Sequence, residues 1–360
     1  MKIVRLRLKG RAYDIIIGSR IISRLPGLLN RLNLGRDAYV ITNPFLKKKF
    51  GGGLKRVLEN AGYSVRLKTV PDSEKAKSLK TASLILADLA AYDRKRKIFI
   101  IALGGGVVGD LSGLVASFYR RGIPYIQVPT TLLAQIDSSI GGKAAVDLPE
   151  GKNLVGAFYQ PRLVLSDIRF LLSLNRRQIA SGMAEAIKYG CIKDKNLFEY
   201  LEKNTPRPTE AALRYIVERC SRIKAGIVER DEKETRGLRT LLNFGHTIGH
   251  AIESATGYAR LNHGEAIAIG MLAAAGISLR LKMLSTPELK RIEALTKKAG
   301  LPVKIRGVPL KAVIKAHYHD KKFRGGKNRL VLLKGLGRAQ VVEGIKLHLI
   351  TAATKERILP

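Results

Sequence analysis

Three of the six histidines of this 360-residue chain lie within eighteen residues, at positions 246, 250 and 263. His246 and His250 are four residues apart, so they would share one face of a helix. His263 follows a short loop and begins a new apolar run, and a hairpin of two helices would return it to His246. Two imidazoles and a carboxylate from elsewhere make a three-ligand metal site with one position open for substrate. Solvated or core histidines are the alternative, but the clustering on glycine-rich helices favours the metal site.

A carboxylate for such a site is available at Glu185, in the segment 183–188. Glu185 and Lys188 are three residues apart and can face one side of a helix. Glu185 also stands in an apolar segment with few other acids. Spacing alone allows a surface ion pair between the two side chains equally well. The histidine pair needs an anionic third ligand, and Glu185 is therefore the predicted one.

A glycine-rich turn at 104–109 reads Gly-Gly-Gly-Val-Val-Gly and satisfies G-x-G-x-x-G, between an apolar strand and a helix. Such glycines let the backbone approach a pyrophosphate, and the helix N-terminus supplies unpaired N–H donors. The turn is atypical, because it lies in the middle of its half of the chain and no acid follows about twenty residues later to hold a ribose. Asp72 or Glu74, after an earlier strand, could do that instead. A tight turn without a ligand is the alternative interpretation.

The stretch 129–143 is dense in small polar groups, and Lys152-Asn153 follows nine residues after Lys143. Lysines beside glycine-rich turns suit phosphate or carboxylate oxygens as compact point charges. Solvated loop lysines are the alternative. Asp137 is the single charged residue within 132–142, which marks it as a further candidate for the site.

Two different kinds of structure must position these residues. Up to about residue 171 strands and helices alternate, which predicts an α/β domain with a parallel sheet covered by helices on both faces. The expected strands are two within 3–17, then 38–42, 64–70, 97–103 and 125–128, and the expected helices are 50–61, 81–91 and 109–118.

From about residue 172 helical periods dominate, so the predicted domains are 1–171, which is α/β, and 172–360, which is mainly α-helical. Substrate is expected in the cleft between the two domains. The expected helices are 179–189, 197–203, 211–227, 245–255, 266–281, 287–299 and 310–317, with a strand at 328–333.

Composition narrows the function classes. The formal net charge is +36, but the basic residues are spread along the whole chain without aromatic interleaving, which disfavours specific nucleic-acid binding. A generally basic surface and attraction of anionic small ligands would give the same composition. No apolar run reaches the length of a membrane span, and residues 1–10 have a strand pattern rather than that of a signal peptide. Two cysteines argue against a disulfide scaffold and predict a reducing cytoplasm.

Taken together, these segments closely resemble the 3-dehydroquinate synthase family, the sugar-phosphate cyclases of the shikimate pathway, from about Tyr13 to about Leu333. Departures from the family pattern are small: Asp72-Ser73-Glu74 stands for Asp-Gly-Glu, and Ala144 follows Gly-Gly-Lys in place of Thr. The motifs that carry the resemblance are 102–110, 119–122, 129–143, 151–153, 182–185, 242–253 and 263–265.

The resemblance implies a Rossmann-like N-terminal domain, a helical C-terminal domain, a homodimer, bound NAD and one divalent metal, zinc or cobalt. It implies that Glu185, His246 and His263 are the metal ligands and that His250 contacts substrate or transfers a proton. Arg121 matches an arginine that reaches the phosphate across the dimer interface. The other substrate-site positions are Asp137, Lys143, Lys152, Asn153, Lys188, Lys224, Arg239, Asn243 and Lys322, the last within a twin lysine. The NAD-site positions are Asn43, Glu74, Lys77, Gly104, Gly105, Gly106, Val107, Asp110, Thr130 and Thr131, with Asp137, Lys143 and Lys152 shared.

The implied reaction converts 3-deoxy-D-arabino-heptulosonate 7-phosphate to 3-dehydroquinate and phosphate. NAD is reduced and regenerated within the cycle, phosphate is eliminated, and the ring closes by an intramolecular aldol step. The substrate's carboxylate and phosphate would explain the cluster of lysines and arginines. Another sugar-phosphate cyclase, or a metal-dependent polyol dehydrogenase that releases stoichiometric NADH, is the alternative. Arg239 beside the Lys152-Asn153 pair favours a substrate that bears a carboxylate.

Overall fold

The computed structural model of the protein describes residues 1–93, 97–206, 208–258, 260–318 and 328–359. It divides into two compact units, Met1–Leu174 with Lys224–Glu229, and Asn175–Ile223 with Arg230–Pro360. The domain boundary expected at 171/172 from sequence stays a prediction, and it does not include the return of Lys224–Glu229 to the first unit. The expected site residue Lys322 lies outside the described residues.

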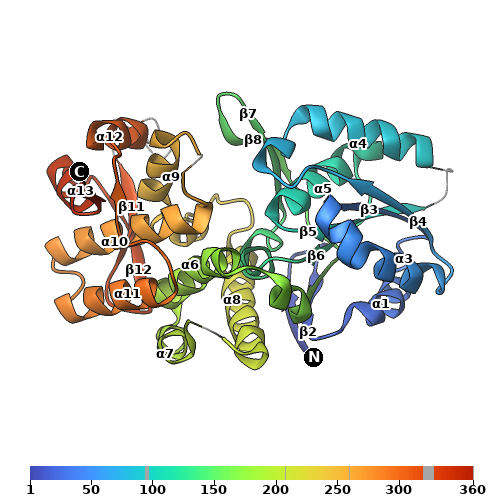
Figure 1. Cartoon of the computed structure of the whole chain (residues 1–360), viewed down its shortest axis with the longest axis horizontal. Helices are drawn as coiled ribbons and strands as arrows, with labels where there is room; N and C mark the ends of the chain where they lie inside the picture. Colours follow the sequence, from blue (N-terminus) through green and yellow to red (C-terminus); the bar gives the residue numbers. More distant parts are fainter. Residues whose placement is uncertain (94–96, 207, 259, 319–327, 360) are drawn as a thin grey trace. The chain divides into compact units, whose positions relative to one another are not determined.

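The first unit is built on a seven-stranded sheet with the strand order β1-β2-β9-β6-β5-β3-β4 (Figure 1). Neighbouring strands are parallel except β1 and β2, which are antiparallel. This confirms the predicted α/β fold with a mainly parallel sheet. The strands are β1 (Lys2–Leu6), β2 (Tyr13–Gly18), β3 (Asp37–Thr42), β4 (Ser64–Thr69), β5 (Ile98–Gly104), β6 (Tyr125–Pro129) and β9 (Leu163–Asp167).

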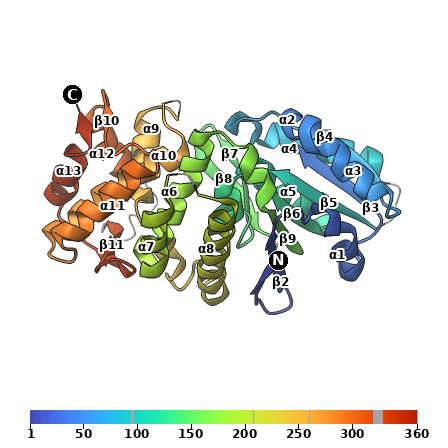
Figure 2. The same cartoon turned by 60° about the horizontal axis from the view of Figure 1, so that its bottom comes forward.

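Alternate residues of the central strands enter two cores, one on each face of the sheet. Ile101 and Leu103 of β5 pack in the core that contains α1 and α3, whereas Ile98 and Ile100 pack in the core that contains α4 and α5 (Figures 1 and 2). Burial on both faces explains why these strands are apolar runs without alternation. The helices are α1 (Leu25–Leu32), α2 (Pro44–Leu46), the π-helical η2 (Lys47–Gly51), α3 (Gly52–Glu59), α4 (Leu79–Tyr92) and α5 (Gly106–Phe118).

Strand order creates a switch point between β3 and β5. The chain runs from β3 outward to β4 and then returns past β3 to form β5. In open α/β sheets, ligands bind where the strand order reverses, beyond the carboxyl ends of the strands. The glycine turn follows β5 and is therefore correctly placed for a nucleotide, although it is not on the first strand of the chain.

The structure also contains strands that were not predicted. The residues around the candidate lysines form an antiparallel hairpin of β7 (Lys143–Leu148) and β8 (Gly151–Phe158), and β9 completes the sheet beside β2. Strands β7 and β8 combine partly buried and exposed positions with glycines at 151 and 156, so their sequence gives little strand signal.

The second unit is largely helical, as predicted, and α10 (His263–Arg280) is its central element. Residues of α10 from Gly264 to Ser278 are buried almost without interruption, with α6, α9, α11, α13 and β11 packed around it. None of the helices in the described ranges is long and apolar enough to cross a membrane. The other elements are α6 (Arg176–Lys193), α7 (Lys195–Asn204), α8 (Glu210–Arg230), α9 (His246–Ala255), α11 (Thr286–Lys298), α12 (Leu310–Tyr318), α13 (Leu347–Lys355), and the paired strands β10 (Ile305–Arg306) with β13 (Ile358–Leu359) and β11 (Arg329–Leu333) with β12 (Ala339–Glu343).

Candidate functional site

Glycines allow the helices of the second unit to approach one another closely. A Cβ atom on Gly270 of α10 would lie 2.1 Å from the carbonyl oxygen of Gly245 and 2.6 Å from the backbone nitrogen of Gly249. A Cβ atom on Gly264 would lie 2.3 Å from the carbonyl oxygen of Ser181 in α6. The backbones of α6, α9 and α10 therefore meet without intervening side chains, and residues on their facing sides converge.

The first turn of α10 is fixed in place by a capping box and by an ion pair. The side chain of Asn262 accepts a hydrogen bond from the Glu265 N–H at 2.9 Å, and the Glu265 carboxylate accepts one from the Asn262 N–H at 2.9 Å. Arg177 of α6 donates to both oxygens of that carboxylate, at 2.6 and 2.7 Å. His263, the first residue of α10, is thereby held at a defined position relative to α6.

Glu185, His246 and His263 meet at this point, each offering one donor atom, and the three donor atoms lie within 4.8 Å of one another. The Glu185 Oε1 atom is 3.4 Å from His246 Nε2 and 3.7 Å from His263 Nε2. Two ligands bonded at about 2.1 Å to one tetrahedral zinc ion are separated by about 3.4 Å. The donor set and its spacing therefore fit a zinc or cobalt ion.

The protonation of His246 also suits metal binding. Its Nδ1–H donates a hydrogen bond to the Phe244 carbonyl oxygen at 3.2 Å, which leaves the lone pair on Nε2 directed toward Glu185. A hydrogen bond of this kind behind a ligating imidazole fixes both its tautomer and its orientation.

His263 has a carboxylate on each side. Its Nδ1 atom is 3.7 Å from Glu253 Oε1, and its Nε2 atom faces Glu185. Burial lowers the pKa of His263, but Glu185 and Glu253 outweigh burial and raise it to about 9. Burial raises the pKa of Glu185, but Lys188 and His263 outweigh burial and lower it to about 2. The Glu185 carboxylate is thus anionic, as a metal ligand must be, and in the metal-free protein it is balanced by cations.

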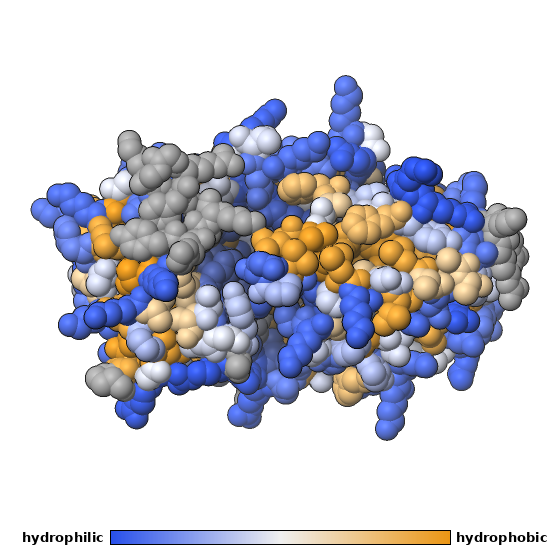
Figure 3. All heavy atoms as spheres, turned by 90° about the horizontal axis from the view of Figure 1, so that it is seen from above, coloured by the Kyte–Doolittle hydropathy of each residue, from blue (hydrophilic) through white to orange (hydrophobic). Residues whose placement is uncertain are grey.

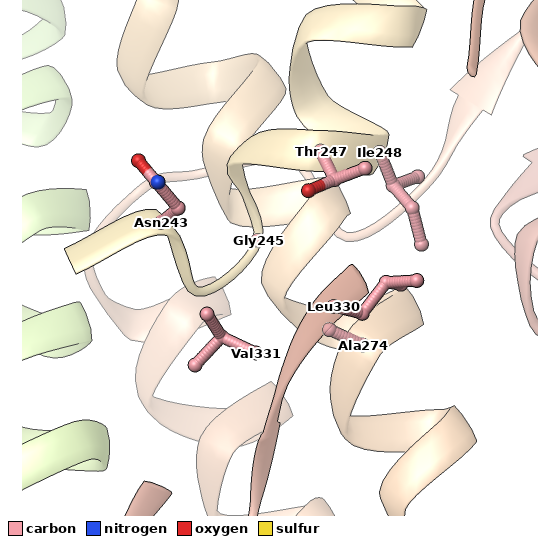
Figure 4. A pocket seen from close by; sticks show the side chains of 7 residues that line it. All are labelled: Asn243, Gly245, Thr247, Ile248, Ala274, Leu330 and Val331. Atoms are coloured by element: carbon pink, nitrogen blue, oxygen red, sulfur yellow. The ribbon is translucent and has the colours of Figure 1, made fainter. Parts of the chain in front are cut away.

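The remaining candidates of the second unit have different surroundings. Lys188 is buried and forms an ion pair with Glu185, whereas His250 is exposed, with its ring centroid 5.3 Å from that of His246. Arg239 is buried; its Nη1 donates to the Glu232 carbonyl oxygen at 2.7 Å. Asn243 lines a crevice with Gly245 and Thr247, and its amide group points away from Leu330 and Val331 (Figure 4).

The first unit gathers the predicted nucleotide residues at the carboxyl ends of β3, β5 and β6. Asn43 follows β3 and caps α2 by accepting a hydrogen bond from the Leu46 N–H at 2.7 Å. Thr130 follows β6, and its N–H donates to the Gly104 carbonyl oxygen at 3.0 Å. Gly105 precedes α5 without a side-chain cap, so the first N–H groups of this thirteen-residue helix have no side-chain acceptor from that position.

Side chains lie close to this turn, so a residue larger than glycine at 105 or 106 would be crowded. A Cβ atom on Gly105 would lie 3.2 Å from Thr131 Cγ2, and one on Gly106 would lie 3.2 Å from Ser138 Oγ. The backbone of Gly105 and Gly106 is partly exposed at a helix N-terminus next to the switch point, whereas Gly104 is buried. These features fit the pyrophosphate of a dinucleotide.

Lys77 links the nucleotide residues to the β7–β8 hairpin. Its ammonium group is 2.6 Å from Asp110 Oδ2 and also contacts the side chain of Asn153. The Asp147 N–H donates to the Lys77 carbonyl oxygen at 2.8 Å, and Asp147 Oδ1 accepts from the Asn153 N–H at 2.7 Å. Burial lowers the pKa of Lys77, but Asp110 outweighs it and raises the net value. Predicted cofactor and substrate residues thus share one network.

Three more predicted residues of the first unit can be placed. Lys224 donates to the side chain of Asp137 at 2.6 Å and to its carbonyl oxygen at 2.7 Å. Arg121 is exposed and has a left-handed backbone, with φ 63°, as has Arg120 before it, with φ 48°. Of the remaining predicted residues of this unit, Thr130 is buried, Lys152, Val107 and Thr131 are partly buried, and Lys143 and Glu74 are exposed.

Glu253, which is buried beside His263, was not predicted as a site residue. Its position three residues after His250 on the same helix could have indicated it. Gln127, whose amide lies against Gly109, and Arg177, which pairs with Glu265, carry no such signal, because their partners are distant in the sequence.

Hydrophilic side chains are not gathered in one place on the face of the molecule drawn in Figure 3. They spread over that face and are interrupted by apolar areas. The Arg–Asp and Lys–Asp pairs of both units, such as Arg66–Asp88 and Arg219–Asp194, neutralise part of the basic excess locally.

Comparison with known proteins identifies the family. Residues 67–181 match the model of the 3-dehydroquinate synthase N-terminal region, and residues 182–323 match that of the C-terminal region. The 3-dehydroquinate synthase of Syntrophotalea carbinolica is 48% identical over 337 residues, which is 92% of this chain and 92% of that protein.

Among solved structures, a 2-deoxy-scyllo-inosose synthase complexed with carbaglucose-6-phosphate, NAD+ and Co2+ is 27% identical with a TM-score of 0.89, covering 99% of this chain and 100% of that one. The 2-epi-5-epi-valiolone synthase of Streptomyces hygroscopicus, with NAD+ and Zn2+ bound, is 28% identical with a TM-score of 0.87, covering 98% and 99%. The chain is thus an enzyme of the lyase class, and it belongs to the 3-dehydroquinate synthase family.

Proposed function

We propose that this chain converts 3-deoxy-D-arabino-heptulosonate 7-phosphate to 3-dehydroquinate and phosphate, with Glu185, His246 and His263 holding a zinc or cobalt ion and the turn at 104–106 holding NAD. The observation that supports this most is the convergence of one carboxylate and two imidazoles at 3.4–3.7 Å in the second unit. The partly exposed Gly105 and Gly106, at a helix N-terminus by the switch point of the first unit, support the cofactor assignment.

The two bound groups supply chemistry that side chains lack. When bound, the metal polarises a substrate hydroxyl as a Lewis acid, and NAD accepts a hydride and returns it in the same cycle. The protein's own residues hold both groups and orient the substrate. The Phe244 carbonyl fixes the imidazole of His246 and Glu253 fixes that of His263, so that both rings continue to face Glu185.

The basic candidates bind the two anionic ends of the substrate. Lys152 and Asn153 lie in the β7–β8 hairpin, and Arg239 lies in the second unit, where its guanidinium is already held by the Glu232 carbonyl. A guanidinium fixed in this way loses little side-chain entropy on binding a carboxylate. The other proposed substrate contacts are Asp137, Lys143, Lys188, Lys224, Asn243 and Lys322.

His250 is the proposed proton-transfer group. Its ring is exposed, and its Nε2 atom lies 4.0 Å from Glu253 Oε2. An exposed imidazole beside a buried carboxylate can accept a proton at Nε2 and pass it on to water. The phosphate of the substrate is a second acceptor for the same proton.

Phosphate release and NADH absorbance, followed together, test the proposal. The expected result with the heptulosonate phosphate, catalytic NAD and zinc or cobalt is phosphate release over many turnovers without accumulation of NADH. Stoichiometric NADH without phosphate would instead identify a polyol dehydrogenase. Turnover with glucose 6-phosphate but not with the heptulosonate phosphate would identify a different cyclase.

The metal ligands are tested separately with Glu185→Gln. This change keeps the shape of the side chain but removes the anionic ligand, so bound metal and turnover should be lost together, with metal affinity reduced about 100-fold or more. Glu199→Gln is the matched control, because Glu199 lies partly exposed on α7 and forms only long ion pairs, with Lys195 at 3.9 Å and Arg291 at 4.0 Å. Full turnover by a metal-free Glu185→Gln enzyme would contradict the assignment.

We also propose that the chain acts as a cytoplasmic homodimer in which Arg121 reaches the phosphate bound by the partner subunit. The exposed side chain and left-handed backbone of Arg121 support a role at the surface of the protomer. Arg121→Ala and Glu185→Gln should each be inactive alone. After mixing and reassembly they should recover about a quarter of the wild-type activity, because half the dimers contain one intact site of two. Recovery of no activity, with both variants dimeric, would exclude the shared site.

A further inference from the structure

We propose that His250, Glu253 and His263 form a second, more exposed divalent-metal site, through which the ion is loaded into the buried cluster of Glu185, His246 and His263. The inference rests on the metal centre proposed above. It concerns how the ion arrives there, and assigns His250 and Glu253 a function apart from the reaction itself. We call the three residues the loading site.

The loading site has the donor geometry of a metal site. One donor atom from each of its residues lies within 4.8 Å of the others. Glu253 Oε2 is 4.0 Å from His250 Nε2, and Glu253 Oε1 is 3.7 Å from His263 Nδ1. His250 and Glu253 are three residues apart on one face of α9, and His263 begins α10, so packed helices hold all three.

His263 belongs to both clusters through its two nitrogens. Its Nε2 atom faces Glu185 and its Nδ1 atom faces Glu253. An imidazole ligates a metal through the nitrogen that carries no proton. Capture of the ion at the loading site displaces the Nδ1 proton of His263. Transfer to the buried cluster then displaces the Nε2 proton and returns a proton to Nδ1, from which it is donated in a hydrogen bond to Glu253. The ring itself does not need to turn.

Exposure falls in steps from one cluster to the other. The exposed fraction of the side chain is 47% for His250 and 34% for His263, but 11% for His246 and 0% for Glu185. A hydrated ion loses its water shell only at a large cost in free energy. His250 replaces some of the waters of the ion first, and the buried Glu185 carboxylate replaces others later. The cost is thereby divided into smaller steps.

Permanent occupation of both clusters is disfavoured. It would require His263 to lose both of its ring protons and to bridge two cations. In the loaded protein Glu253 is needed as the acceptor of the Nδ1–H group that orients His263 toward the metal. The expected final content is therefore one ion per chain, and the loading site acts in the rate of uptake.

Uptake of Co2+ by the chelator-treated, metal-free chain tests this directly. Stopped-flow absorbance in the visible d–d bands follows loading, and elemental analysis after gel filtration gives the final content. His250→Asn, which keeps the size but removes the ligand, should slow loading by about tenfold or more while the final content remains one ion. His348→Asn is the matched control, an exposed histidine on α13. It should load at the wild-type rate.

His250→Cys makes the ion at the loading site visible, because a thiolate–Co2+ bond absorbs strongly in the near ultraviolet. This band should appear before the final d–d spectrum and then decay, or persist if the thiolate traps the ion. His250→Ser, which is nearly isosteric, should show no such band. The wild-type chain should show none either, because Cys191 and Cys220 are both buried.

Each result supports or overturns the inference. Wild-type loading in His250→Asn, or no thiolate band in His250→Cys, would overturn it. The double variant Glu185→Gln, His250→Cys separates the two proposals: a thiolate band without a final d–d spectrum supports both. If Glu185→Gln alone loads one ion with wild-type affinity, the buried centre fails, irrespective of the loading rate.

Discussion

The two units of this protein form their candidate sites in different ways. In the first unit the candidate nucleotide site is made from strand ends and backbone, where Asn43, Gly105 and Thr130 follow three adjacent parallel strands. In the second unit the candidate metal site is made from side chains on three helices, and their convergence depends on how closely those helices pack.

This difference determines how each site should respond to a single added methyl group. The sheet fixes the strand ends through hydrogen bonds that side-chain changes do not remove. The helices are fixed by backbone contact, most closely at Gly270, where the three nearest atoms to an added Cβ all belong to the backbones of Gly245 and Gly249. The metal site should therefore be the more sensitive of the two.

The strongest test of this comparison is Gly270→Ala. The new Cβ atom would lie 2.1 Å from the Gly245 carbonyl oxygen, so α9 and α10 must separate and His246 must move away from Glu185. We expect loss of bound metal and a fall in stability of about 3 kcal/mol or more, measured by elemental analysis and thermal unfolding.

Gly276→Ala is the matched control on the same helix. Its Cβ atom would meet Arg280 Nη1 at 3.4 Å and Ala353 Cβ at 3.7 Å, which are ordinary contacts. This variant should retain its metal. Its free energy of unfolding should rise by less than about 1 kcal/mol, because alanine is a better helix former than glycine. Equal loss of metal in both variants would show that backbone contact is not what holds the site together.

A smaller effect is expected from Gly109→Ala in the first unit. The new Cβ atom would lie 2.7 Å from Gln127 Oε1, which is the end of a side chain that can turn aside. We expect NAD affinity, measured by calorimetric titration, to fall by no more than about tenfold, or 1.4 kcal/mol, with metal content unchanged. Gly53→Ala on α3, where the Cβ atom would meet nothing within 4 Å, should leave affinity at the wild-type value. Complete loss of NAD binding in Gly109→Ala would contradict the tolerance inferred for this unit.

Much of both sites could be predicted from sequence because their residues lie in local patterns. The spacing of His246 and His250, the loop before His263 and the glycine turn after a buried strand are all readable over fewer than twenty residues. The helices at 245–255 and 266–281 are confirmed as α9 and α10. The choice of Glu185 needed the resemblance or a chemical argument, because it is 61 residues from the nearest histidine of the site.

The remainder depends on contacts that no local pattern encodes. The β7–β8 hairpin was not predicted, and it is held in place by the bond from the Asp147 N–H to the Lys77 carbonyl, seventy residues apart. The return of Lys224–Glu229 to the first unit depends on the Lys224–Asp137 pair and on the Arg7 N–H donating to Glu229 at 2.6 Å. Glycines that permit helix contact read in the sequence only as weak helix formers.

The smallest predicted effect tests whether the stability of the first unit can be changed without affecting the metal site. Asp88 on α4 accepts hydrogen bonds from Arg66 at 2.8 Å and Tyr39 at 2.7 Å and lies 3.3 Å from Lys68. Arg66 is the largest cause of a pKa for Asp88 of about 2, below the ordinary value of 3.8, although burial opposes it. Asp88→Asn should lower the melting temperature at pH 7 by about 3 °C, because Arg66 is largely exposed and its ion pair is partly screened.

The sign of the pH dependence follows from the lowered pKa. Since the folded chain binds a proton at Asp88 less readily than the unfolded chain does, the contribution of Asp88 is complete above about pH 5 and is lost as the pH falls from about 4 to 2. The difference in melting temperature between wild type and Asp88→Asn should therefore be constant from pH 7 to 5 and narrow below pH 4. Asp14→Asn, which breaks the exposed Arg5–Asp14 pair at 3.0 Å, should shift the melting temperature by less than about 1 °C at pH 7. If Asp88→Asn also lost metal at pH 7, the two sites would be coupled through the fold, and the separate responses argued for Gly270 and Gly109 could not hold.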